Sequence, residues 1–138
     1  LRSASPGRRA PAAMDRTPSR RPAVGNCPFC DRIARGEYDD AEYLWEVVSF
    51  EPLNPVTPGH RLFLPRTHAL HPAPDEVGDA MAEAERWAKT QGEDFNLITS
   101  SGTAATQTVP HIHIHYVPRR PDDGLPLPWT GQEARRGE

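Results

Sequence analysis

The feature that most constrains the fold is an alternating segment, His111-Ile-His-Ile-His-Tyr-Val117, that lies between two prolines. Alternation of polar and apolar residues with a period of two is typical of a half-buried β-strand, in which successive side chains point to opposite faces. We therefore predict a strand over Val109–Val117. Its three histidines would stand on an open face at intervals of about 6.6 Å, and its isoleucines would pack against the core.

The row formed by His111, His113 and His115 indicates chemistry, because nothing structural requires three imidazoles on one open face. Two interpretations follow from the residues themselves. Imidazoles are common metal ligands, so the row could hold a metal. They are also nucleophiles and proton carriers near neutral pH.

The segment before this row is rich in small and polar residues. Ser100–Thr106 is predicted to be a loop, and Gln107 and Thr108 follow it directly. Hydroxyl, amide and backbone N–H donors in such a loop can hold a phosphate without a fixed positive charge.

The remaining chain predicts an α+β fold with a mostly antiparallel sheet of about five strands, one long helix and a short N-terminal helix. Hydrophobic periodicity and turn residues define these elements. They are a short helix over 31–36, a hairpin or two short strands over 42–50, a proline-rich turn over 52–59, a strand over 60–64, an amphipathic helix over 75–89 and a strand over 95–99.

Composition divides the 138 residues into three parts. Residues 1–24 contain six arginines and one acid, and we predict a disordered basic arm there. Residues 25–121 form the predicted domain and 122–138 a C-terminal tail. Because the chain begins with Leu1 and Met14 lies inside the arm, residues 1–13 are interpreted either as an upstream in-frame extension or as non-native residues. The arm has a formal charge of +5 and the rest of the chain −8, which argues against nucleic-acid binding except through the arm.

Other features of the sequence concern the compartment. No apolar stretch approaches the roughly 18 to 20 residues of a membrane span, and no secretory signal is visible, so we expect a cytoplasmic protein without a membrane partner. Cys27 and Cys30 are spaced as C-x-x-C. This pair suits a zinc site or thiol redox chemistry, or it is a fortuitous reduced pair.

With these segments the chain resembles the histidine-triad (HIT) superfamily over roughly residues 26–120. The histidine row matches the H-φ-H-φ-H-φ-φ signature, where φ is an apolar residue. The other matching segments are Cys27-Pro-Phe-Cys30, Phe50 to His60 with Asn54-Pro, Leu64-Pro-Arg-Thr-His68 and Gln107-Thr-Val.

The resemblance implies a nucleotide hydrolase or transferase that acts on a nucleoside phosphoramidate or a dinucleoside polyphosphate. His113 would attack the α-phosphorus and form a nucleotidyl-histidine intermediate. His115 would assist the leaving group, His60 would be a further active-site histidine, and His111 would complete the catalytic row. An alternative is a nucleotide-binding or sensing module with little turnover.

The resemblance also implies how an adenosine or guanosine phosphate would be held. Gln107 and Thr108 would contact the phosphates. The family often has a ribose-binding Asp where this chain has Pro52, so Asn54 is the expected substitute. Relatives usually carry an amide residue at the position of Ser100. These two departures motivate the binding-module alternative.

A structural zinc ion is implied as well. Its ligands would be Cys27, Cys30, His68 and His111, with His71 as the alternative third ligand. Such a Cys₂His₂ set leaves no open coordination position. Dimeric relatives have a tail that reaches the partner's active site, so we expect a homodimer in which Trp129 helps to complete the substrate pocket. A third hypothesis, removal of AMP from DNA ends, is disfavoured by the acidic domain.

Overall fold

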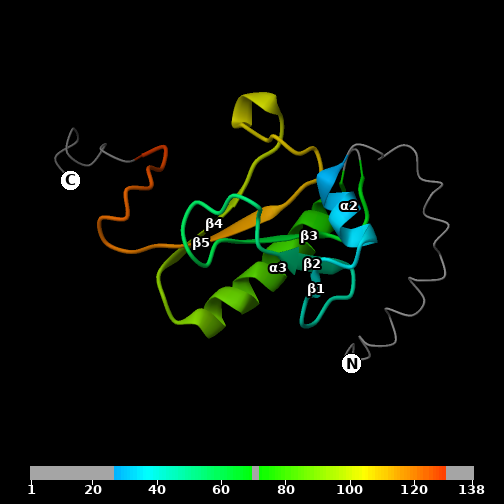
Figure 1. Cartoon of the computed structure of the whole chain (residues 1–138), viewed down its shortest axis with the longest axis horizontal. Helices are drawn as coiled ribbons and strands as arrows, with labels where there is room; N and C mark the ends of the chain where they lie inside the picture. The colour runs from blue at the N-terminus through cyan, green and yellow to red at the C-terminus, as the bar shows by residue number, and fades with distance from the viewer. Residues whose placement is uncertain (1–26, 70–71, 130–138) are drawn as a thin grey trace.

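The computed structural model describes residues 27–69 and 72–129, which form one five-stranded antiparallel sheet with a helix on each face (Figure 1). The strand order is β1-β2-β3-β5-β4, and every neighbouring pair is antiparallel. The predicted α+β fold is therefore confirmed.

The arm over 1–24, His71 and residues 131–138 lie outside the described residues. The bounds are α2 Pro28–Ala34, β1 Asp39–Asp40, β2 Val47–Phe50, β3 Arg61–Pro65, α3 Pro74–Gln91, β4 Phe95–Thr99, a 3₁₀ turn η3 Thr103–Ala105 and β5 Ile114–Pro118.

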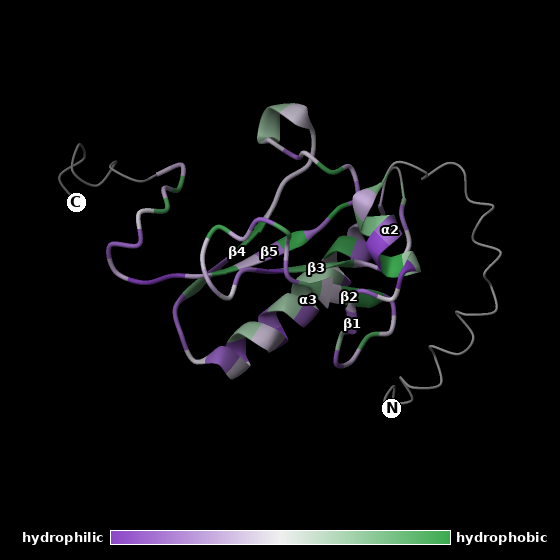
Figure 2. Cartoon of the chain, in the orientation of Figure 1, coloured by the Kyte–Doolittle hydropathy of each residue, from purple (hydrophilic) through white to green (hydrophobic). Residues whose placement is uncertain are grey.

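The long helix α3 agrees with the predicted amphipathic helix. Pro74 opens it, and the Ala73 N–H donates to the Glu76 carboxylate at 2.9 Å, so one of the free N–H groups at this end is satisfied. Gly92 ends it in the left-handed conformation with φ of 69°. Purple polar residues recur along α3 in Figure 2, whereas β2 and β3 are mainly green.

Two apolar clusters, one on each face, hold the layers together. The cluster under α3 includes helix alanines and the inward side chains of the central strands, among them Phe63, Ile114 and Tyr116. The cluster on the other face consists of Val48, Phe50, Leu62 and Leu64, with Phe29 and Ile33 of α2 packed against it. Both faces of β2 and β3 are thus covered, and the residues of these two strands are buried almost without interruption.

Two short elements differ from prediction because tertiary contacts override local preference. The expected strands over 42–50 are only β2, preceded by β1 upstream of the predicted segment. The backbone N–H groups of Tyr43 and Leu44 donate to the Glu83 carboxylate at 3.1 and 2.6 Å, so this stretch faces α3 and does not pair in the sheet. The short helix begins earlier than predicted, with Cys27 as its N-cap and Cys30 inside it.

Candidate active site and metal cluster

The histidines gather on the sheet face opposite α3. His115 lies across the ladder from Leu62, which belongs to the apolar cluster under α2. Its neighbour Ile114 points the other way into the cluster under α3. The alternation predicted for this segment therefore holds for residues 114–116.

The predicted strand over Val109–Val117 is wrong in its first half, because β5 begins only at Ile114. Both neighbouring ladders end there: Phe63 of β3 and Thr99 of β4 are each paired with Ile114. The expected open face is also wrong for two of the three imidazoles, since His111 is 1% and His113 8% exposed. Side-chain contacts, not ladder pairing, hold these two residues in place.

His113 is fixed through both its ring and its backbone. Its Nδ1 lies 2.7 Å from the carbonyl oxygen of His111, and because a carbonyl only accepts, Nδ1 carries the proton and donates. The Thr99 hydroxyl donates to the His113 carbonyl at 2.9 Å. Burial lowers the pKa of His113, although the hydrogen bond to the His111 carbonyl opposes this. The ring is therefore neutral at neutral pH, with the lone pair on Nε2.

His60 and His115 form the second part of the site. The Val56 N–H donates to Nδ1 of His60 at 3.1 Å, so the proton of a neutral His60 ring lies on Nε2. That Nε2 is 2.9 Å from Nδ1 of His115 and donates to it. The proton of a neutral His115 ring then lies on its own Nε2. Burial lowers the pKa of His60 and, together with the charges of His113 and His60, lowers that of His115 to about 4.

Gly59 places His60 at the end of the predicted proline-rich turn. Its φ is +93°, a conformation that other residues rarely adopt. A Cβ at this position would lie 3.1 Å from the Pro118 ring. Glycine at this position therefore lets the turn pass close to β5 without strain and bring His60 to His115.

The four predicted metal ligands lie together, although they come from three separate segments. One ligand atom from each of Cys27, Cys30, His68 and His111 lies within 4.8 Å of all the others. Three sulfur to nitrogen distances are 3.6 Å. Tetrahedral zinc, with bonds of about 2.3 Å to sulfur and 2.0–2.1 Å to nitrogen, separates such atoms by about 3.6 Å.

The surroundings of His111 also suit a metal ligand. Its Nδ1 faces both cysteine sulfurs, and its Nε2 donates to the Pro65 carbonyl at 2.8 Å. This second hydrogen bond fixes the tautomer with a bare Nδ1, as metal ligation requires. Burial lowers the pKa of His111 to about 4, so its ring is neutral at neutral pH. The residues present therefore fit a closed Cys₂His₂ zinc site.

The predicted phosphate- and ribose-binding residues lie on loop segments outside the helices and strands. The Gly102 N–H donates to the Gln107 side-chain oxygen at 2.8 Å, which orders the loop that contains η3 and leaves the Gln107 amide NH₂ as a donor. Ser100 is half-buried directly after β4. The side chains of Asn54, Thr108 and Trp129 are exposed.

Sequence reasoning missed four groups that contact the histidines. They are the Phe29 ring, the Thr99 hydroxyl, the Pro65 carbonyl and the Val56 N–H. The position of Phe29 between the two cysteines was a usable signal. The backbone groups gave none, because every residue type carries them.

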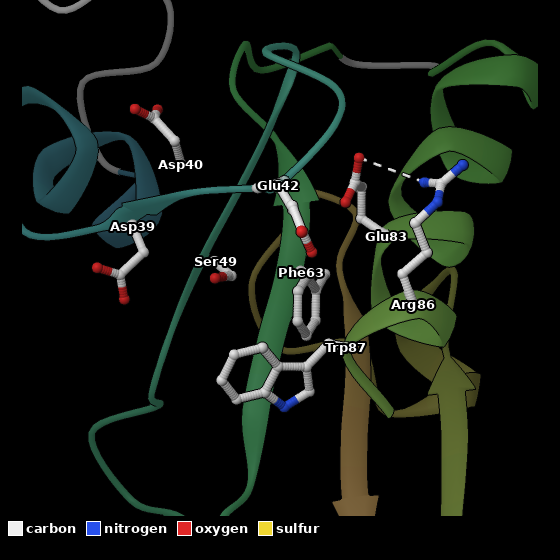
Figure 3. A pocket seen from close by; sticks show the side chains of 9 residues that line it. Asp39, Asp40, Glu42, Ser49, Phe63, Glu83, Arg86 and Trp87 are labelled. Atoms are coloured by element: carbon white, nitrogen blue, oxygen red, sulfur yellow. Dashed lines mark ion pairs between the residues drawn. The ribbon is translucent and has the colours of Figure 1, made fainter. Parts of the chain in front are cut away.

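A cavity of about 150 Å³ lies on the other side of the sheet, between α3 and the strands β1 to β3 (Figure 3). Its walls include Ser49, Phe63 and Trp87 together with four carboxylates. Three of these are in ion pairs: Asp39 with Arg61, Asp40 with Arg66 at 2.7 Å, and Glu83 with Arg86 at 3.3 Å. Most of the acidic side chains that line the cavity are thus neutralised by arginines of the fold. The cavity is not part of the histidine site.

Comparisons with known proteins agree with this geometry. A family model described as the HIT domain matches residues 43–122. The adenosine 5'-monophosphoramidase of Saccharomyces cerevisiae is 36% identical over 115 residues, which cover 78% of this chain and 72% of that protein. An adenylylsulfatase of Arabidopsis thaliana is 34% identical over 125 residues, and the alignment covers 80% of this chain and 59% of the plant protein.

Solved structures give the same result. A Zn-bound histidine triad family protein from Mycobacterium smegmatis superimposes with a TM-score of 0.64 at 29% identity, covering 81% of this chain and 90% of the other. A HIT family hydrolase from Clostridium thermocellum gives a TM-score of 0.58 at 30% identity, covering 75% of this chain and 96% of the other.

No helix in the described ranges is long and apolar enough to cross a membrane.

Proposed function

Since this chain belongs to the HIT domain family, we propose that it is a nucleotide hydrolase or transferase that cleaves a phosphoramidate or phosphoanhydride at the α-phosphorus. One observation carries the proposal: the His113 Nδ1–H is held by the His111 carbonyl at 2.7 Å, so Nε2 is the free nucleophilic atom. The names of the yeast and plant relatives support an adenosine nucleotide as substrate.

The reaction would proceed in two displacements on His113. Nε2 attacks the α-phosphorus, a P–N bond forms and the bond to the leaving group breaks. A proton from solvent, which the negatively charged substrate favours, first charges the His60–His115 pair. The departing amine or phosphate then takes the Nε2 proton of His115, and the pair is left neutral. Water then attacks the phosphorus of the nucleotidyl-His113, the P–N bond breaks, and the proton of the water returns to His115. His60 keeps His115 in the required tautomer through the 2.9 Å hydrogen bond.

Donors near the loop would stabilise charge on the phosphate oxygens. Gln107 supplies its amide NH₂, and Thr108 and Ser100 supply hydroxyls. Asn54 is proposed to bind the ribose in place of the carboxylate that Pro52 lacks. Cys27, Cys30, His68 and His111 would hold a zinc ion, whose ligation would join α2 to the catalytic segment and supply folding energy.

We also propose a cytoplasmic homodimer. A reduced C-x-x-C metal site favours a reducing compartment. Residues 119–129 leave the end of β5 and extend beyond the sheet (Figure 1), and Trp129 is 52% exposed on this segment. In a two-fold dimer this tail could complete the partner's substrate pocket.

The test is incubation of the full chain with adenosine 5'-monophosphoramidate, with detection of released AMP and of an acid-labile adenylyl-protein adduct. Wild type should give both, and His113→Ala should lower the rate by more than about a thousandfold. Lys89→Gln, at an exposed position of α3, is the control and should behave as wild type. Tight AMP binding without turnover or adduct would instead favour the nucleotide-sensing alternative, which Pro52 and Ser100 motivate.

A further inference from the structure

We infer that Phe29 is a positioning residue that makes the orientation of the His113 imidazole depend on occupancy of the Cys₂His₂ cluster. The inference deepens the proposed function, since it assigns a role to Phe29 in the reaction of His113. It starts from two connections between the metal cluster and the proposed nucleophile, one through residue 111 and one through the Phe29 ring.

The first connection is His111, which takes part in both sites. Its imidazole belongs to the metal cluster, 3.6 Å from each cysteine sulfur, and its carbonyl accepts the hydrogen bond from Nδ1 of His113. A shift of this residue in the cluster therefore moves the acceptor that sets the His113 tautomer. No regular strand pairing stabilises this segment, because β5 begins at Ile114.

The second connection is Phe29, which lies between the two cysteines in the first turn of α2. Its ring meets the His113 ring edge to face, with centroids 5.0 Å apart and an interplanar angle of 90°. Its ring also lies against the rings of His111 and Phe50, with centroid separations of 6.0 Å and 5.5 Å. Phe29 thus forms one wall beside the His113 imidazole, and rotation of that imidazole in this direction requires Phe29 to move.

The position of that wall depends on the cysteines. Helix α2 has only seven residues, none of them buried, and helices shorter than about 12–15 residues are marginal without tertiary support. Its support comes from Phe29 and Ile33 on the sheet, from Arg32, which donates to the Glu51 carbonyl and lies over the Phe50 ring, and from the two cysteines in the cluster. Loss of the metal would release the cysteines at both sides of Phe29 and loosen its contact with His113.

The experiment compares the full chain with zinc, the chain after chelation, Phe29→Leu and Ile33→Ala. Ile33 packs on the same apolar cluster as Phe29, so its truncation controls for general loosening of α2. The primary measurement is ¹⁵N and ¹H NMR of the histidine side chains without substrate, which reports the His113 Nδ1–H and the bare Nε2. Zinc content and steady-state kinetics accompany it.

We expect zinc-loaded wild type and Ile33→Ala to show one sharp His113 Nδ1–H signal. Phe29→Leu and the metal-free chain should show exchange broadening or mixed tautomers. In Phe29→Leu, kcat should fall between about tenfold and a hundredfold with KM within about twofold, because a displaced nucleophile affects the chemical step. An unchanged His113 signal in either Phe29→Leu or the metal-free chain would overturn the inference, as would equal changes in Ile33→Ala and Phe29→Leu. If wild type turns over no nucleotide, the proposed function fails, while the NMR comparison still decides the role of Phe29.

Discussion

His60 and His115 are hydrogen-bonded ring to ring, with 2.9 Å between Nε2 of His60 and Nδ1 of His115. The chain of donors starts at the Val56 N–H, passes through His60 and leaves the proton of a neutral His115 on Nε2. Two histidines that are 55 residues apart in the sequence therefore act as one unit. The direction of these hydrogen bonds determines which nitrogen of His115 can give a proton to a leaving group.

Replacement of His60 should impair proton donation by His115. His60→Ala removes the donor that fixes the tautomer, and we expect kcat to fall by about a hundredfold for a substrate with a poor leaving group. His60→Gln, whose amide can still donate to Nδ1 of His115, should retain more activity. The loss should shrink for a substrate whose leaving group needs no proton. An equal loss for both substrates would contradict this role.

Stability should decrease in mild acid because of His115. Its pKa is about 4 in the fold against an ordinary 6.5, mainly through burial, so the unfolded chain binds the proton more readily. The contribution of the neutral His115 ring to the free energy of unfolding is fully present above pH about 6.5. It is lost as pH falls toward 4. The slope is at most about 1.4 kcal/mol per pH unit for this histidine. Urea unfolding between pH 4 and 8 measures it, and His115→Gln should reduce the slope; an unchanged slope would refute the assignment.

Removal of the metal should lower the unfolding temperature. Zinc bound to the folded chain at a thousandfold excess over its dissociation constant adds about 4 kcal/mol of stability. Elemental analysis should find one zinc per chain, and Cys30→Ser should lose it. Thr67→Ser, beside His68 but outside the cluster, serves as the control. A metal-free wild type with the same unfolding temperature as the loaded protein would contradict the site.

Glu83 should stabilise the fold without affecting the reaction. Its carboxylate is 2% exposed, accepts the N–H groups of Tyr43 and Leu44, and pairs with Arg86. Glu83→Ala leaves two partly buried N–H donors unsatisfied and should cost about 3 kcal/mol. Glu83→Gln, which keeps an acceptor oxygen, should cost less. Denaturant unfolding gives these values, and kcat at a temperature where both variants are folded should match wild type, because Glu83 lies on the sheet face opposite the histidines.

Much of the fold could be predicted from the sequence because local patterns coincided with tertiary requirements. The helix over Pro74–Gln91 and the strand Phe95–Thr99 agree with their periodicity, and proline and glycine define the helix ends. The prediction was wrong for residues 109–113 and 42–46. Residues 109–113 are not in a strand because the pairing of β5 with β3 and with β4 ends at Ile114. In residues 42–46, the buried Glu83 carboxylate of α3 binds the backbone N–H groups of Tyr43 and Leu44. Neither partner is visible in a local window of sequence.

The sequence by itself determined which chemical groups this protein has and that they form a histidine-triad pattern with a cysteine pair. Spacing of residue types carries that information, because it is written along one chain. Only the tertiary structure decided that His111 and His113 are buried, that His60 bonds to His115, and that Phe29 contacts the His113 ring. These relationships depend on how α2, the turn at Gly59 and the end of β5 meet, and backbone carbonyls and N–H groups that no residue type distinguishes complete them.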